Sequence, residues 1–158
     1  MVDRSDDELV AAALVEARRA LAHDDVPVGA IVISAEGEVL ASRHNERELS
    51  GDPTAHAEVL ALRDAAERLG SWRLDGCTLV ATLEPCVMCA GAAQQSRIAR
   101  VVFGAMDSKA GALGSLYNVG ADPRFPHHYE VAMRVREAEC ATVISRFFSD
   151  KRFVDGER

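Results

Sequence analysis

Two short segments place metal-binding side chains at points where the chain is expected to enter a helix. The first contains His56 and Glu58, and the second contains Pro85, Cys86 and Cys89. Zinc binds Cys thiolates and His imidazole, usually with tetrahedral geometry. Two cysteines three residues apart share a face of a first helical turn, and the N-terminus of a helix favours thiolate over thiol. The fold must therefore bring two helix N-termini together around one metal ion.

Three protein ligands without a convincing fourth describe a catalytic zinc site rather than a closed structural one. The open position would hold a water molecule whose pKa zinc lowers to about 7. Glu58 begins the same helix as His56, so its carboxylate can take a proton from this water and return it to a leaving nitrogen. Taken separately, the Cys pair could be a redox pair or half of a structural site, and His-x-Glu could be chance. Together and in this order they form the signature of the zinc deaminases.

The order of helical and extended patterns predicts an α/β domain. Ser5 and Glu8 form a capping box at the start of the first helix, and Pro85 opens a later one. Alternation of helices and strands favours three layers with a mixed sheet, and residues 1–158 read as a single domain. We expect helices at 5–21, 54–69, 85–96 and 136–153, strands at 28–33, 39–42, 78–82, 100–104 and 129–135, and loops at 43–53 and 104–120.

Composition limits the partners and the location. The net charge of −7 argues against a broad phosphate-binding surface but allows a small basic patch beside one site. The sequence shows neither a signal-peptide pattern nor a run of 18 apolar residues, so we expect a cytoplasmic protein without a membrane partner. Cys77 and Cys140 lie in apolar stretches and are interpreted as buried hydrophobic residues.

Several longer motifs resemble one family over nearly the whole chain. They are residues 27–30, 52–58, 82–92, 96–98 and 101–105, followed by the more discriminating loop Asp107-x-Lys109-x-Gly111-x-x-Gly114-Ser115-Leu116. The chain resembles the bacterial tRNA-specific adenosine deaminases of the TadA family, in the cytidine/deoxycytidylate deaminase superfamily.

This resemblance implies a three-layer α/β/α cytidine-deaminase-like fold with a five-stranded mixed sheet and one Zn²⁺ per subunit. It implies conversion of the wobble adenosine of a tRNA anticodon, typically in an arginine tRNA, to inosine. Zinc-bound hydroxide would attack C6, and ammonia would leave. The family is usually a homodimer in which the anticodon arm of the tRNA touches both subunits.

The resemblance also assigns roles within the site. Asn45 would hydrogen-bond the flipped base, Val28 and Leu83 would form apolar pocket walls, and the Ala57 N–H and Glu58 would hold the target atoms. Without the family, Asn45 reads as an ordinary loop residue and the two apolar residues read as core. RNA contacts outside the pocket are expected from Asp107, Ser108, Lys109, His128, Phe147 and Phe148, with local positive charge from Lys109, Arg146, Lys151 and Arg152.

One departure from the family pattern lies at Pro126-His127-His128-Tyr129, where Tyr129 changes a possible phosphate contact. His23 and His44 are interpreted as surface or loop histidines without a role.

Two alternative functions share parts of this interpretation. A deaminase of free guanine, cytosine or a nucleoside would have the same zinc site, and the acidic net charge mildly favours it. The loop 107–116 favours RNA. A zinc-stabilised RNA-binding or scaffold domain would need a closed metal site, and Glu58 argues against it because a structural site needs no carboxylate beside an open position.

Overall fold

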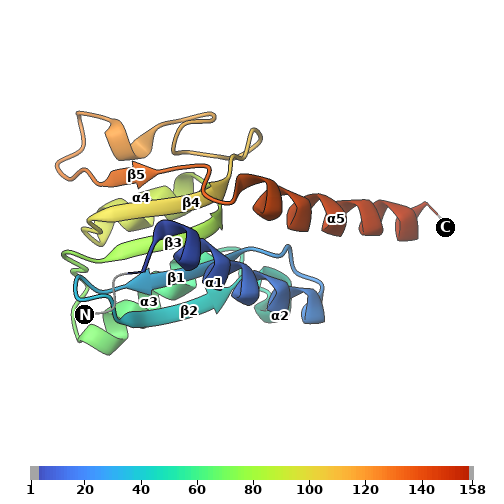
Figure 1. The fold of residues 1–158 in the computed structure, drawn as a ribbon, viewed down its shortest axis with the longest axis horizontal. Helices are drawn as coiled ribbons and strands as arrows, with labels where there is room; N and C mark the ends of the chain where they lie inside the picture. Colours follow the sequence, from blue (N-terminus) through green and yellow to red (C-terminus); the bar gives the residue numbers. More distant parts are fainter. Residues whose placement is uncertain (1–3, 157–158) are drawn as a thin grey trace.

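Five strands form one mixed sheet in the computed structural model, which describes residues 4–156 (Figure 1). Their order across the sheet is β2-β1-β3-β4-β5. β1 runs antiparallel to both of its neighbours, whereas β3, β4 and β5 are parallel to one another. The C-terminal ends of four strands therefore lie at the same edge as the N-terminal end of β1. The bounds are β1 Gly29–Ile33, β2 Val39–His44, β3 Thr78–Leu83, β4 Arg100–Ala105 and β5 Glu130–Ala132.

Helices cover both faces of this sheet, which confirms the expected three-layer arrangement. α3 and α4 pack on one face, and α1 and α5 pack on the other. Alternate strand residues supply the two cores: Val32 and Leu79 face α3 and α4, whereas Ile33 and Val80 face α1 and α5. The helices are α1 Asp6–Arg19, α2 Arg47–Ser50, α3 Ala57–Leu69, α4 Val87–Gln95 and α5 Glu137–Asp155, with 3₁₀ turns η1 Ala20–His23 and η2 Val119–Ala121.

Local signals explain where most of these elements begin and end. Ser5 and Glu8 form the predicted capping box at the start of α1. Gly70 ends α3 with a φ of 64°, the left-handed conformation that glycine adopts without strain. Gly29 allows β1 to lie directly on α1, because a Cβ there would come within 2.0 Å of the Ala13 carbonyl oxygen.

Several predicted boundaries were wrong, and the helices expected at 54–69 and 85–96 begin only at Ala57 and Val87. The first helix ends at Arg19 and continues as the 3₁₀ turn η1. The segment expected to be a loop at 43–53 contains the end of β2 and the short helix α2. The fifth strand has only three residues, because Arg134 and Arg136 adopt φ values of 64° and 52°, which extended backbone does not allow.

α5 extends beyond the strand ends on the side of the sheet where β2 leads into α2 (Figure 1). Only Cys140 and Phe147 of this helix are buried, and Phe148 and Phe153 are 44% and 74% exposed. Lys151 Nζ lies 3.2 Å from Asp24 Oδ2, so the projecting half of α5 contacts the turn that follows η1. Among the helices of residues 4–156, none has the length and apolar character needed to cross a membrane.

Candidate metal centre and active site

Three side chains from two helix starts meet at one point. His56 is the N-cap residue of α3, Cys86 is the N-cap residue of α4, and Cys89 lies in the first turn of α4. His56 Nδ1 is 3.6 Å from the Sγ atoms of both cysteines, and the three ligand atoms all lie within 4.8 Å of one another. One imidazole nitrogen and two sulfurs are a donor set that suits zinc. Within residues 4–156 this group of possible metal ligands consists of these three residues.

The electrostatic environment of these three side chains shifts their pKa values in a way that favours cation binding. A hydrogen bond from the Cys89 thiol, aided by one from His56, lowers the pKa of Cys86 to about 4. The same contact with Cys86, together with burial, raises the pKa of Cys89, so the pair retains one proton between its two sulfurs. The hydrogen bond with Cys86 also raises the pKa of His56, although burial opposes this. A divalent cation bound here would replace this proton, and both cysteines would bind it as thiolates.

Glu58 lies beside these ligands and is only 4% exposed. Burial raises the pKa of this carboxyl to about 7, although the charge on His56 and a backbone hydrogen bond oppose the shift. A cation held by the neighbouring ligands would lower this pKa again, because it favours the carboxylate form. With a cation bound, Glu58 would therefore be a carboxylate that can accept a proton beside the metal ligands.

A pocket of about 140 Å³ opens beside the three ligands. This volume is well below the roughly 300–1,000 Å³ of clefts that hold drug-sized ligands, so it suits one small ring system. Asn45 lies in the wall of the pocket, and two hydrogen bonds fix the orientation of its amide. Its Nδ2 donates to the Val26 carbonyl, and its Oδ1 accepts from the Arg47 N–H. The pocket is lined by Val26, Val28, Asn45, Arg47, His56, Ala57, Glu58, Leu83, Glu84, Cys86, Asp107 and Ala110.

A buried carboxylate shapes the loop that closes one side of this pocket. Glu84 is 1% exposed and accepts hydrogen bonds from the backbone N–H groups of Asp107, Leu113 and Ser115, each 3.0 Å long, and from the Ser115 hydroxyl. Burial alone would raise the pKa of Glu84, but these hydrogen bonds outweigh it and hold the pKa below its ordinary value. Gly111 permits this approach, because a Cβ there would lie 2.3 Å from the Glu84 carboxyl carbon.

The structure brings together some of the residues predicted from sequence and separates others. Val28, Asn45, Ala57, Leu83 and Asp107 line the pocket with His56, Glu58 and Cys86. Cys89 is fully buried behind them. Outside the pocket lining are the exposed residues Ser108, Lys109, His128 and Phe148, of which His128 hydrogen-bonds the Asp122 carbonyl at 2.8 Å.

Sequence reasoning missed Val26, Arg47, Glu84 and Ala110 as pocket residues. Glu84 carried a usable signal, because an acidic residue directly after a buried strand needs hydrogen-bond donors. Arg47 carried none, since the helix that holds it was taken for a loop.

Comparison with known proteins identifies relatives of this chain. Residues 3–105 match the model of the cytidine and deoxycytidylate deaminase zinc-binding region. The tRNA-specific adenosine deaminase of Bacillus subtilis (strain 168) is 46% identical over 140 residues, which cover 89% of this chain and 86% of that protein.

Two solved structures are similar throughout. One comes from a study of A-to-I editing by tRNA:A34 deaminases at the wobble position of transfer RNA. It has a TM-score of 0.82 and 41% identity, covering 86% of this chain and 98% of the other. The other is a guanine deaminase from Nitrosomonas europaea, with a TM-score of 0.76 and 26% identity over 93% of this chain and 86% of the other.

Proposed function

Because this chain belongs to the cytidine and deoxycytidylate deaminase family and, within it, to the tRNA-specific adenosine deaminases, we propose that it converts the wobble adenosine of a tRNA anticodon to inosine. The observation that carries the proposal is the small pocket in which His56, Cys86 and the buried Glu58 share one wall. Its size suits a single base turned out of a single-stranded loop, where unpairing and unstacking cost little. An arginine tRNA is the first substrate to test, because the family resemblance implies it.

In the reaction, water adds at C6 of adenine and the exocyclic amino group leaves as ammonia. His56, Cys86 and Cys89 would hold the zinc ion, which when bound would supply Lewis-acid activation of the water. Glu58 transfers both protons of the water: one goes to N1 of the base as the oxygen adds to C6, and the other goes to the amino nitrogen as it leaves, so that the product carries C6=O and N1–H. The Ala57 N–H and the Asn45 amide orient the base, and Val28 and Leu83 pack against its faces.

Contacts outside the pocket are proposed to hold the anticodon arm. Arg47 stands at the pocket with its side chain half exposed, and Lys109 lies on the exposed loop after Asp107. Positive groups here attract phosphates locally even though the net charge is −7. The projecting half of α5 adds Phe148 and basic side chains, and exposed aromatic rings stack on unpaired bases. His128 is a further candidate contact.

We also propose that the protein works as a cytoplasmic homodimer, with α4 and the loop between β4 and η2 at the interface. Val87, Leu116 and Tyr117 are 59%, 53% and 62% exposed. They belong to one surface, because Cys86 forms a β-bridge with Gly111, whose carbonyl accepts from the N–H of Leu116. Large apolar side chains gathered in this way favour a second chain as cover. Light scattering should show a dimer that Val87→Glu dissociates, whereas Trp72→Glu at an equally exposed position elsewhere should leave it intact.

The proposed activity is tested by measuring inosine on an anticodon stem-loop of an arginine tRNA that carries adenosine at the wobble position. A stem-loop with its only adenosine elsewhere in the loop is the matched control, and free adenosine, cytidine and guanine are tested in parallel. Turnover of the wobble substrate alone supports the proposal. Turnover of guanine or a free nucleoside without the stem-loop would overturn it in favour of a small-molecule deaminase.

A further inference from the structure

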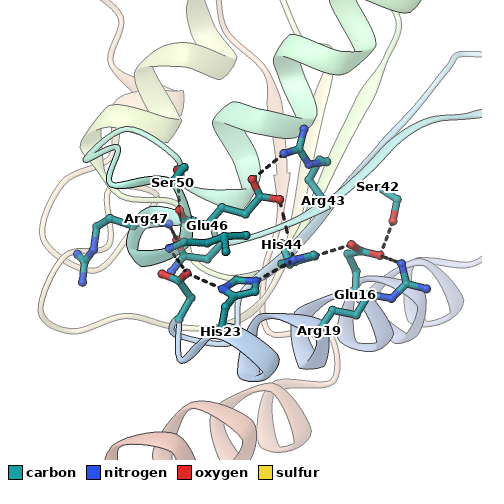
Figure 2. Close-up of polar contacts among 12 residues, drawn as sticks. Glu16, Arg19, His23, Ser42, Arg43, His44, Glu46, Arg47 and Ser50 are labelled. Carbon is teal, nitrogen blue, oxygen red and sulfur yellow. Dashed lines mark hydrogen bonds and ion pairs between the residues drawn. The ribbon is translucent and has the colours of Figure 1, made fainter.

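Two histidines outside the active site are joined by a hydrogen bond between their Nε2 atoms, which lie 3.1 Å apart (Figure 2). His23 ends the 3₁₀ turn η1, and His44 ends β2. Their side chains are only 16% and 17% exposed, so interpreting them as surface or loop histidines was wrong. The other nitrogen of each ring meets a carboxylate: His23 Nδ1 lies 2.7 Å from Asp25. His44 Nδ1 lies 2.7 Å from Glu16, so four side chains form one continuous line of hydrogen bonds.

This line of hydrogen bonds needs one proton more than two neutral imidazoles carry. Burial alone would raise the pKa of Asp25, but hydrogen bonds from two backbone N–H groups and from His23 outweigh it and hold the pKa below its ordinary value. Glu16 accepts from the Ser42 hydroxyl and lies 3.3 Å from Arg19, as a carboxylate does. Carboxylates only accept, so both Nδ1 atoms are donors, and the hydrogen bond between the Nε2 atoms takes a third proton. The pair therefore shares one proton and carries one positive charge.

The surrounding charges favour this extra proton. Five carboxylates and three cations lie in the network or next to it, which leaves an excess of two negative charges that the shared proton halves. Arg47 points away from the pair (Figure 2). The charged groups are Glu16 and Arg19 of α1, Asp24 and Asp25 after η1, Arg43 of β2, Glu46 before α2, Asp64 of α3 and Lys151 of α5.

The network also supports α2, a helix of four residues with no buried side chain. Asp25 takes the place of a capping side chain, because its two oxygens accept from the N–H groups of Glu48 and Leu49 at 2.7 and 3.1 Å. A helix this short is not stable without such contacts. Three residues of the pocket wall directly follow members of the network in the sequence: Val26 after Asp25, Asn45 after His44, and Arg47 after Glu46.

We propose that His23 and His44 position the base-binding wall of the pocket by sharing one proton. Joined in this way, the rings hold Asp25 against α2, and the wall formed by Asn45 and Arg47 stays in place. Without the proton, two Nε2 lone pairs would face each other at 3.1 Å and the rings would separate. The proposal rests on the proposed function for its substrate, a base presented by an RNA loop, but the protonation of the histidines can be measured without any activity.

The first test follows the proton itself. Long-range ¹H–¹⁵N spectra of zinc-loaded protein with labelled histidine report which ring nitrogens are protonated, and the spectra of His23→Ala and His44→Ala identify the two rings. At about pH 6.5, the four ring nitrogens of the pair should carry three protons. Only two protons on these nitrogens at this pH would overturn the proposal.

The second test asks whether α2 depends on the pair, by hydrogen exchange at the amides of Glu48 and Leu49. His23→Ala should raise their exchange rates by about tenfold or more, because Asp25 loses its support. His23→Lys should keep them protected, because an ammonium donates to Asp25 and His44 without a shared proton. Unchanged exchange in His23→Ala, with its fold checked by circular dichroism, would contradict the positioning role.

The third test separates KM from kcat on the anticodon stem-loop. If the wall of His23→Ala is in place about one-tenth of the time, KM rises about tenfold, while kcat changes less than about threefold because the metal ligands lie on α3 and α4. KM of the wild type should rise with pH as the third proton leaves, whereas KM of His23→Lys should stay low. His127→Gln, which changes a partly buried histidine bonded to the Ile98 carbonyl outside this network, should match the wild type.

An unchanged KM in His23→Ala would overturn the proposal, and so would a KM in His23→Lys as high as that of His23→Ala. A chain that deaminates no stem-loop would refute the proposed function instead. The protonation and amide-exchange measurements would then still decide whether the pair holds α2.

Discussion

Replacing Glu84 by alanine tests whether one buried carboxylate holds the pocket loop in place. The substitution leaves three backbone N–H groups, those of Asp107, Leu113 and Ser115, without their acceptor. A buried donor left unsatisfied costs about 1–3 kcal/mol, so three would cost roughly 3–9 kcal/mol if the loop kept its shape. Because the loop lies at the surface and can open to water, we expect the lower end, a loss of about 3 kcal/mol in the free energy of unfolding.

The assay is urea unfolding of the zinc-loaded protein, combined with hydrogen exchange at the three amides. In the wild type these amides should exchange slowly, and in Glu84→Ala they should exchange much faster because the loop opens. Glu67→Ala is the matched control, because this exposed glutamate on α3 lies far along the helix from His56, and its loss should change stability by no more than about 0.5 kcal/mol. A loss below about 1 kcal/mol in Glu84→Ala, with the three amides still protected, would refute the reasoning.

Four other substitutions give separate expectations. Glu58→Ala should keep zinc, measured by elemental analysis, but lower the inosine-forming rate by about 10²–10⁴-fold. Cys86→Ala should lose the zinc itself. An unchanged rate in Glu58→Ala would contradict the proton-transfer role. Gly29→Ala places a Cβ against the backbone of α1. We expect the free energy of unfolding, measured by chemical denaturation, to fall by an amount at or above the upper end of about 1–3 kcal/mol. An unchanged unfolding midpoint would count against the close contact. The hydrogen bond from Arg100 lowers the pKa of Asp6 in the folded state, so the unfolded state binds more protons and this contribution to stability disappears as the pH falls below the ordinary value of 3.8. Asp6→Asn should therefore flatten the acid limb of a plot of unfolding midpoint against pH, and identical acid limbs would argue against the ion pair.

The group of candidate metal ligands could be picked out from sequence because its chemistry is local. Cys86 and Cys89 share one helical turn, and His56 and Glu58 share another, so spacing and residue type sufficed. The layered fold followed from alternating helices and strands in the same way.

The His23–His44 pair could not be found this way. Residues 23 and 44 meet only because β2 lies beside β1 and η1 bends back toward the end of β2. Asp25, the carboxylate partner of His23, is local, but Glu16, the partner of His44, comes from α1. Such long-range contacts leave no periodic pattern in the sequence. The length of the fifth strand was overestimated for a related reason. Its residues have a propensity for extended structure, but Arg134 and Arg136 take left-handed conformations.

The short length of β5 also limits how copies of this chain can associate. β5 is an edge strand, and a free edge offers unpaired N–H and C=O groups to the strands of other molecules. With only three residues before the backbone turns at Arg134, β5 gives an incoming strand little to pair with. This edge therefore offers little to sheet-to-sheet pairing, and the longer β2 is the edge strand at which such pairing has more backbone available.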